Sequence, residues 1–588
     1  MKVTQDRPYG KREGLNILAA QLKEDRLRHE SRWREVAAVT RPDSPRWLTD
    51  DHNKGHRKDQ AILDCTATLA SQTGAAGMMA GITSPARPWF QLSIGDETLS
   101  EVYAVKHWLD EVSDRMRKVL IQSNFYKSAP AVYEDLFDYA TAPMWIEEDP
   151  ETVIWTQALP LGSYWVGADR KGRVNIFYRE FPMTVRNLVR QFGRMDESGN
   201  IDWSKFSGHV KEQYQTGHME TRIDICHMVS PNENYRPDSA LSKHKKFLSC
   251  YYELGRSSSM ASYEHELDND DRFLRESGYD YFPVLCPRWK VSGEDVYGTS
   301  CPGFTALGDN NQLQHGERRR MEALDQTIYP PLVGPTGMKR VKIGALGETT
   351  YSDDAAQEKN GWRAVYQIDP RFAELDAMQE QLRNRIKKVY FADLFLMMTE
   401  SDRRQITAEE IRVRQQEKLL RVGPVLEQLN QDFLDPLIEI TFAVMMKQGR
   451  IPEPPEELLM SEAQVTVQYV SIMAQAQKAI GLSSYHEFGQ VLTNFGAIFP
   501  DVLDLVNMNK YVEKISTNLG LPAEVMNPPE VVAQIRAERA KAAQAQQATE
   551  AIAAGAGAAK DLAGASMEGD SALTRLLEVA KAGQLTAA

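Results

Sequence analysis

The sequence predicts an α+β protein that is mainly helical. Long segments with apolar residues at helical spacing occupy the first 141 residues and much of the chain after residue 301. Between residues 151 and 254, short β-rich segments alternate with turn residues. Two helical segments of similar length also flank an insert rich in Pro and Gly, which indicates two paired helices with a small β element at one end.

The composition is that of an ordinary globular protein with an acidic balance. The 588 residues are 42% apolar and 26% charged, and the formal net charge is −13. A chain of this length can bury several cores, so we expect about two to four structural regions. The charge argues against a protein that grips DNA or RNA through a broad basic face, but it is compatible with one that lets nucleic acid pass.

The first 141 residues are expected to be mostly helical. Leu15, Leu22 and Val36 fall near one face of an amphipathic helix, which Arg41-Pro42 ends. A second segment is rich in Ala, Gly and Thr, whose small side chains allow close packing. The expected helices are Leu15–Thr40, Asp59–Ile82, Leu99–Gln122 and Ala129–Thr141, with a short strand at Pro88–Leu92.

The pattern changes from Glu151 onward. Runs rich in Val, Ile, Tyr and Trp are separated by turn sequences, which predicts an antiparallel sheet with helices packed around it. A helix is expected at Met183–Phe192. The expected strands are Thr152–Thr156, Ser163–Gly167, Arg173–Glu180, Thr221–Val229 and Phe247–Leu254.

The paired helical segments are Pro302–Ile328 and Arg371–Met398. At 1.5 Å per residue, each would span about 40 Å. Neither carries an obvious catalytic group, which indicates a mechanical element. Gly308 and Gly316 interrupt the first segment, and each costs about 1 kcal/mol relative to Ala in a free helix, so this helix is the one whose straightness is least certain from sequence.

The chain after the pair is predicted to be helical. Thr407 and Glu410 form a capping box that begins a long helix reaching about Gln448, and prolines at 424 and 436 are expected to kink it. The sequence from Gly555 onward has low complexity. Further helices are expected at Ser471–Ile480, His486–Phe495, Val502–Leu519 and Val531–Ile552.

Motifs for cofactor, metal or nucleophilic chemistry are missing. The sequence contains no G-x-x-x-x-G-K-[ST], no H-E-x-x-H and no G-x-S-x-G, and its five cysteines form no C-x-x-C pair. The most apolar run, Thr68–Ile82, is shorter than a membrane-spanning helix requires. We therefore expect a protein that is not an enzyme, with no catalytic residues, no cofactor, no metal and no membrane span.

Basic residues cluster in the second paired segment. Arg383, Lys387 and Lys388 lie off the apolar face formed by residues such as Leu382 and Ile386. A solubilising surface and a stripe that contacts phosphates both explain this cluster.

Several motifs occur in a particular order and spacing along most of the chain. They are SRWREVAAVTRPDS (Ser31–Ser44), ASQTGAAGMMAGITSPARPWFQLS (Ala70–Ser93), FYREFPMTVRNLVRQFG (Phe177–Gly193), PVLCPRWKVSGEDVYGTSCPGFTALGDNNQLQ (Pro283–Gln314), TAEEIRVRQQE (Thr407–Glu417) and VTVQYVSIMAQAQKAIG (Val465–Gly481). Taken together, they resemble the podovirus-type portal protein, the head-to-tail connector of short-tailed double-stranded DNA phages. Residues after about 527 show no matching motif.

The resemblance implies a portal fold that assembles into a ring, a dodecamer in the usual case, around a central channel. Its tunnel-loop residues Glu400, Ser401, Asp402, Arg403 and Arg404 would face DNA, and Arg383, Lys387 and Lys388 would form a basic stripe on the lumen. The regions it implies are a wing at 1–295, a first stem helix at 296–329, a clip at 330–368, a second stem helix at 369–398, a tunnel loop at 399–407, a kinked wing helix at 408–449, a crown at 450–527 and an Ala-rich tail or barrel helix at 528–588.

The resemblance also implies a function and a location. The ring would sit at the capsid vertex of the virion, after assembly in the host cytoplasm, and double-stranded DNA would be packaged and ejected through it without sequence specificity. Its partners would be the terminase, the major capsid and scaffolding proteins and tail adaptor proteins. The alternatives are an enzymatic packaging subunit, either a nuclease or an ATPase, and another virion tail-adaptor protein.

Deletion of Asp402–Gln405 should leave ring formation intact but impair DNA packaging or retention, because the expected tunnel loop would contact DNA without holding subunits together. Phage yield and packaged DNA are the measurements, and ring formation by the purified variant is the control. A normal yield of infectious phage would contradict the expected role of this loop.

Overall fold

The computed structural model describes residues 11–47, 58–95, 99, 102–194, 201–239, 241–254, 272–328, 332–333, 363–364, 372–393, 423–459, 465–469, 488–492, 506–507, 510–512, 515 and 531–547. They belong to two compact units, Met1–Gly520 and Leu521–Ala588. In the second unit, residues 531–547 form a helix within the expected Val531–Ile552. The capping box at Thr407 and the helix expected at Ser471–Ile480 lie outside the described residues.

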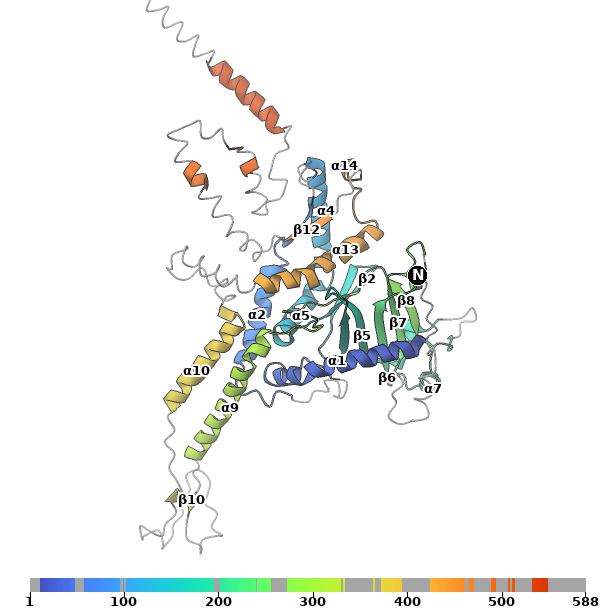
Figure 1. The fold of residues 1–588 in the computed structure, drawn as a ribbon, viewed down its shortest axis with the longest axis vertical. Coiled ribbons are helices and arrows are strands. Elements are labelled where there is room, and N and C mark those ends of the chain that lie inside the picture. Colours follow the sequence, from blue (N-terminus) through green and yellow to red (C-terminus); the bar gives the residue numbers. More distant parts are fainter. Residues whose placement is uncertain are drawn as a thin grey trace, which may run out of the picture. The chain divides into compact units, whose positions relative to one another are not determined.

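The N-terminal part of the first unit is helical, as the sequence predicts (Figure 1). The expected starts of these helices are wrong by about one turn or more, and the largest difference is at the second helix, which begins at Thr66 and not at Asp59. The Asp64 carboxylate accepts the Thr66 backbone N–H at 2.8 Å, which fixes this start. The elements are α1 (Lys11–Val39), α2 (Thr66–Ile82), β1 (Phe90–Ile94), α4 (Tyr103–Gln122) and α5 (Phe125–Tyr139).

A five-stranded antiparallel sheet follows, in the order β4-β5-β6-β7-β8. Helix α1 covers one face of it, where Leu15 and Leu22 pack with Trp165, Tyr178 and Tyr252. The antiparallel sheet is confirmed, whereas β8 was not predicted. The strands are β4 (Tyr164–Ala168), β5 (Val174–Thr184), β6 (Arg222–Pro231), β7 (Phe247–Glu253) and β8 (Arg275–Tyr279).

A three-stranded antiparallel sheet, in the order β3-β2-β9, packs toward the opposite face of the large sheet. Trp145 of this small sheet contacts Phe177 and His227, with ring centroids 5.9 and 5.0 Å apart. Two short helices, α6 and α7, also pack on this face of the large sheet. The elements are β2 (Met144–Asp149), β3 (Val153–Ala158), β9 (Val284–Leu285), α6 (Val185–Phe192) and α7 (Gly208–Gln215). Strands β2 and β9 were not predicted.

Strand β1 pairs with β12 (Val465–Tyr469), a segment from the C-terminal part of the chain. Phe90 lies opposite Tyr469, and Ile94 lies opposite Val465. The alternation in V-T-V-Q-Y is typical of a half-buried strand, and it is the local signal that could have identified β12. This pairing joins two parts of the sequence that lie more than 370 residues apart.

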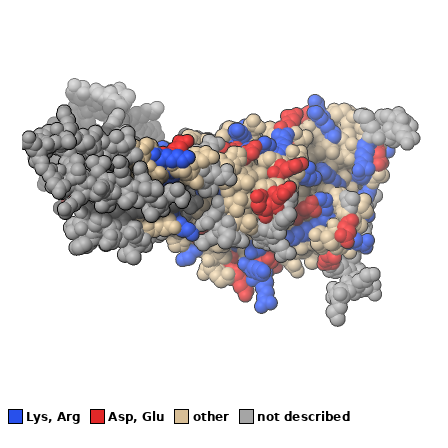
Figure 2. Space-filling view, turned by 90° about the horizontal axis from the view of Figure 1, so that it is seen from above, with Lys and Arg blue, Asp and Glu red and all other residues tan. Residues whose placement is uncertain are grey.

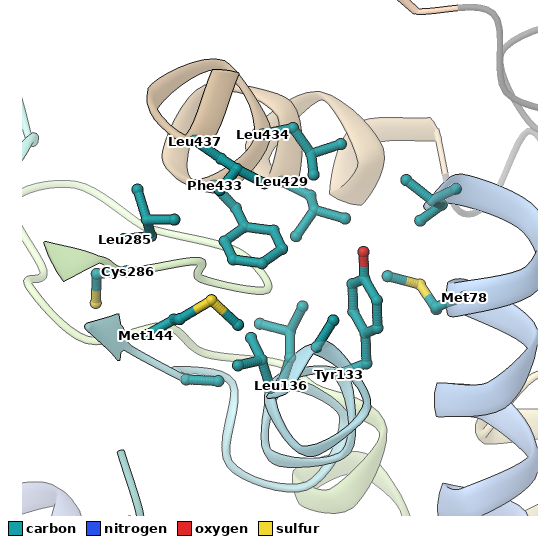
Figure 3. Close-up of a cluster of buried hydrophobic side chains, with 14 of the residues drawn as sticks. Met78, Tyr133, Leu136, Met144, Leu285, Cys286, Leu429, Phe433, Leu434 and Leu437 are labelled. Carbon is teal, nitrogen blue, oxygen red and sulfur yellow. The ribbon is translucent and has the colours of Figure 1, made fainter. Parts of the chain in front are cut away.

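The helix at residues 423–447 closes the largest apolar core, and α14 (Glu456–Leu459) follows it. A π-helical segment, Asn430–Leu434, precedes α13 (Asp435–Lys447). The Asp435 N–H donates to the Asn430 carbonyl, five residues back, immediately before Pro436, which has no N–H to donate. The expected irregularity at Pro436 therefore takes the form of a widened turn. Four side chains from this helix point toward α2, α5, β2 and β9 (Figure 3), namely Leu429, Phe433, Leu434 and Leu437.

Phe433→Ala should lower the free energy of unfolding by about 3–5 kcal/mol, because it removes a fully buried ring that packs against Phe125 and Tyr133. Urea unfolding followed by tryptophan fluorescence measures this loss. The matched control is Met446→Ala on α13, where the side chain is 59% exposed and the change should stay within about 0.5 kcal/mol. Equal losses in the two variants would contradict the assigned packing.

Candidate functional site: a pair of antiparallel helices and its anchor

Helices α9 (Pro302–Ile328) and α10 (Phe372–Val389) lie side by side and antiparallel (Figure 1). The short strands β10 (Leu332–Val333) and β11 (Arg363–Ala364) pair in the segment between them. The sequence-based expectation of two paired helices flanking a small β element is thereby confirmed. Helix α10 ends earlier than the expected Met398, because Phe391 takes a left-handed conformation with φ of 56°.

Helix α9 is continuous despite its two glycines. A Cβ atom at position 316 would lie 3.4 Å from the Gln379 side-chain nitrogen on α10, whereas position 308 faces open space. Leu313 of α9 and Leu382 and Ile386 of α10 are buried in the same apolar core. Packing against α10 therefore compensates for the weak helix propensity of Gly316.

Charges on the two helices are paired across the contact. Arg383 lies 2.7 Å from Glu317, and Arg320 lies 3.2 Å from Asp376. Arg385 donates to Asp309 at 3.1 Å. Together α9 and α10 carry seven acidic and seven basic residues, so the pair has no net charge.

A polar junction joins the helix pair to the segment before α2. The Gln314 amide oxygen accepts the backbone N–H groups of Leu63 and Asp64, at 2.7 and 2.9 Å, and its nitrogen donates to the Asp64 carbonyl at 2.7 Å. Arg383 donates to the Asp64 carboxylate at 2.8 Å. Burial raises the pKa of Asp64, but hydrogen bonds from Thr66 and Arg383 outweigh it, so the net pKa is lowered and Asp64 stays ionised.

A buried ionic cluster lies at the base of the pair. We call Arg41, Glu134, Asp135 and Asp138 the anchor cluster. The guanidinium of Arg41 contacts all three carboxylates of α5, at 2.5, 2.6 and 2.7 Å. Asp138 is fully buried and also accepts the hydroxyl of Tyr390, directly after α10, at 3.2 Å.

Helix α9 also reaches the anchor cluster. A Cβ atom at Gly303, in the first turn of α9, would come within 2.4 Å of the Asp138 backbone carbonyl, so only glycine permits this approach. The anchor cluster therefore connects the ends of α1, α5, α9 and α10 at one point.

The anchor cluster holds three acids around one cation. Burial raises the pKa values of Asp135 and Asp138, and Arg41 only partly offsets this effect. For Arg41, burial lowers the pKa, but the charges of Asp138 and Asp135 outweigh burial and raise the net pKa. Among the described residues, Arg41 is the only cation that forms an ion pair with these three neighbouring carboxylates.

The residues singled out from the sequence fall in different places. Arg383 is 26% exposed and is held by Asp64 and Glu317. Lys387 is half-buried and Lys388 is exposed. The expected tunnel-loop residues at 400–404 lie outside the described residues, so contact of any of these residues with DNA stays a prediction.

Sequence reasoning missed the anchor cluster. Arg41 was interpreted only as the end of a helix, although it lies in one of the motifs that carry the family resemblance. Glu134, Asp135 and Asp138 have the spacing of a charged helix face, which normally indicates contact with solvent. No local signal identifies them as the partners of one arginine.

The described surface shows no sign of metal binding or membrane insertion. No group of three or more His, Cys, Asp or Glu side chains among the described residues is arranged to hold a metal ion. Within the same part of the chain, no helix combines the length and the apolar character needed to cross a bilayer. On the face drawn in Figure 2, basic and acidic side chains are intermixed over the described residues.

Comparisons with known proteins place this chain in a family. The profile of the family described as "Bacteriophage head to tail connecting protein" matches residues 12–526. The chain belongs to this family.

Two phage proteins resemble the chain over nearly its whole length. The chain is 37% identical to the portal protein of Salmonella phage epsilon15, over 96% of this chain and 98% of that protein. It is 36% identical to the probable portal protein of Bordetella phage BPP-1, over 94% of this chain and 96% of that protein. The resemblance stated from the motifs is thus confirmed. The matches support a phage portal function and do not favour a packaging enzyme or a tail adaptor.

Replacing Arg41 with Met should destabilise the protein by about 3–5 kcal/mol, because the three acids of the anchor cluster lose their cation. The loss should be larger at pH 8 than at pH 5. The pKa values of Asp135 and Asp138 are raised in the folded state, so these acids favour the folded state below their unfolded pKa of about 4. That contribution is lost as the pH rises through the folded pKa values and the carboxyl groups ionise.

Urea unfolding at both pH values measures the effect of Arg41→Met. Arg319→Met is the control, because Arg319 is exposed on α9 and its ion-pair partner among the described residues is the exposed Glu322. A loss for Arg41→Met that is the same at pH 5 and pH 8, or no larger than that of the control, would contradict the role of the anchor cluster.

Proposed function

We propose that this chain is the subunit of a ring, a dodecamer, that forms the channel for double-stranded DNA at the capsid vertex. Helices α9 and α10 would be the stem, with the clip between them at 330–368 and the wing at 1–295. The tunnel loop at 399–407, the wing helix at 408–449, the crown at 450–527 and the tail at 528–588 complete the assignment. The observation that carries the proposal is the charge-neutral helix pair, rooted in a buried ionic cluster, in a chain of the connector family.

A neutral wall suits a channel through which DNA must move. Each base pair brings two phosphates, and a surface lined with unpaired Lys or Arg would bind them and slow the duplex. The paired charges of α9 and α10 remove that attraction, and the chain as a whole carries −13. DNA would therefore pass without sequence specificity and without being held.

A few basic residues would still approach the DNA. We propose Lys387 and Lys388 on α10, together with the loop Glu400, Ser401, Asp402, Arg403 and Arg404, as the DNA-facing set. Arg383 was included in this stripe from its sequence position. Its hydrogen bonds to Asp64 and Glu317 support a second role, in which it fixes the helix pair to the segment before α2.

Exposed apolar side chains on the helix pair support assembly with further copies of this chain. Met321, Leu324 and Ile328 follow one another at helical spacing on α9, and each is about half exposed. Met378 on α10 is also half exposed. Ring closure would bury such a stripe between neighbouring subunits.

Membership of the connector family supports the proposed location and partners. The ring would sit in the virion at the head-tail junction, after assembly in the host cytoplasm. It would dock the terminase during packaging and tail adaptor proteins afterwards, and it would contact the major capsid and scaffolding proteins. Its role would be structural, with no catalytic step of its own.

The purified chain should form rings that negative-stain microscopy and mass photometry detect. Leu324→Glu with Ile328→Glu should reduce the ring fraction, because it places charges in the proposed subunit contact. Met446→Glu is the matched control, since Met446 is equally exposed but lies on α13. A strictly monomeric protein at high concentration would contradict the proposed function, and unchanged rings in the double variant would contradict the proposed contact.

A further inference from the structure

A cavity of about 980 Å³ opens between β5, the small sheet and α6. Nothing in the proposed channel function uses it. Its size is at the upper end of the range for ligand pockets in proteins, which is enough for a few amino-acid residues. We call it the arginine groove, because four of its lining residues are Arg46, Arg179, Arg190 and Arg222.

Arg179 lies half-buried in the groove. Its guanidinium packs against Trp145 and Phe181, at 4.9 and 4.6 Å from the ring centroids. Its Nε donates to His227 Nδ1 at 3.2 Å. Burial, together with the charges of Arg179 and Arg275, lowers the pKa of His227 well below its usual value, so this imidazole is neutral.

The neutral His227 leaves the Arg179 charge uncompensated. With Nδ1 as acceptor, His227 carries its proton on Nε2 and donates to the Ser249 hydroxyl at 3.0 Å. No carboxylate of the described residues lies within 4.0 Å of the Arg179 guanidinium. A half-buried cation that contacts aromatic rings and a neutral imidazole is suited to bind an anion.

The other arginines of the groove add to this charge. Arg46, Arg190 and Arg222 are exposed, and no described residue forms an ion pair with any of them. Of the two acids in the lining, Glu180 points toward α1. Its carboxylate accepts hydrogen bonds from Lys23 of α1 and Tyr178 of β5. Glu147 therefore remains as the acid of this lining whose negative charge can offset the positive charges of the four arginines.

The remaining lining favours a peptide over a nucleic acid. The rings of Trp145 and Phe181 already contact the Arg179 guanidinium, so they are not free to stack on bases. Trp155, at 41% exposure, is a single exposed tryptophan ring of the lining, which falls short of the successive aromatic platforms on which single-stranded nucleic acid stacks. Neutral polar side chains, including Gln157, Asn187 and Gln191, are suited to the amides of an extended backbone. We propose that the arginine groove binds an extended acidic segment of a partner protein, whose carboxylates are held by Arg179, Arg190 and Arg222.

A fluorescein-labelled hexaglutamate peptide is the probe for this site, with the full-length chain and fluorescence polarisation as the readout. The chain carries −13, so it repels a polyanion in general, and binding requires a local cationic site. We expect saturable binding that weakens as the salt concentration rises.

Arg190→Glu with Arg222→Glu should weaken hexaglutamate binding by about tenfold or more, which corresponds to about 1.4 kcal/mol. Both side chains are exposed, so the fold is preserved. Arg170→Glu is the matched control, because Arg170 is exposed in the β4–β5 turn outside the groove lining, and it should leave the affinity within about twofold.

Three results would overturn the proposal. They are the absence of hexaglutamate binding up to about 1 mM, an equal loss of affinity in the control variant, and tighter binding of a six-nucleotide thymidine oligomer than of hexaglutamate at the same site. The last result would assign the groove to single-stranded nucleic acid.

Discussion

The contact of Arg41 with three carboxylates of α5 is the interaction on which the rest of this structure depends. It places a cation at the end of α1 inside a region that would otherwise hold only negative charge. Tyr390 and Gly303 bring α10 and α9 to the same acid, Asp138. A long helix pair acts as a rigid element only if its base cannot rotate, and a buried ionic cluster with directional hydrogen bonds supplies that restraint better than apolar packing alone.

The helix pair combines rigidity with a neutral surface. Ion pairs across α9 and α10 fix the register of the two helices and cancel their charges at the same time. Surface ion pairs contribute little stability individually, so their main effect here is on geometry and on the field that a passing polyanion experiences. Arg320, Arg383 and Arg385 thus serve pairing between the two helices. The arginine groove, in contrast, holds cations that form no ion pair with the described residues.

Much of the fold could be predicted from the sequence, because helix periodicity and strand alternation are local signals. The four N-terminal helices, the antiparallel sheet and the helix pair were all expected. Strands β2 and β9 were missed, since β2 ends in three acids and β9 has only two residues. The pairing of β1 with β12 could not be predicted, because it depends on contacts between distant segments.

The candidate site was less predictable than the fold. The basic stripe of α10 was visible, but the partner that fixes Arg383, Asp64, lies 319 residues away in the sequence. The anchor cluster resembles a solvated charged face until α5 is placed against Arg41. Of these residues, Arg41 lies in a family motif, and that motif does not indicate what its side chain contacts.

A three-dimensional electron-microscopy reconstruction of the assembled particle would decide the role of the helix pair, because it locates α9 and α10 relative to the symmetry axis. We predict that the two helices of every subunit surround the central opening, with the anchor cluster farther from the axis. Helices α9 and α10 at the outer rim of the particle, with another element lining the opening, would contradict it.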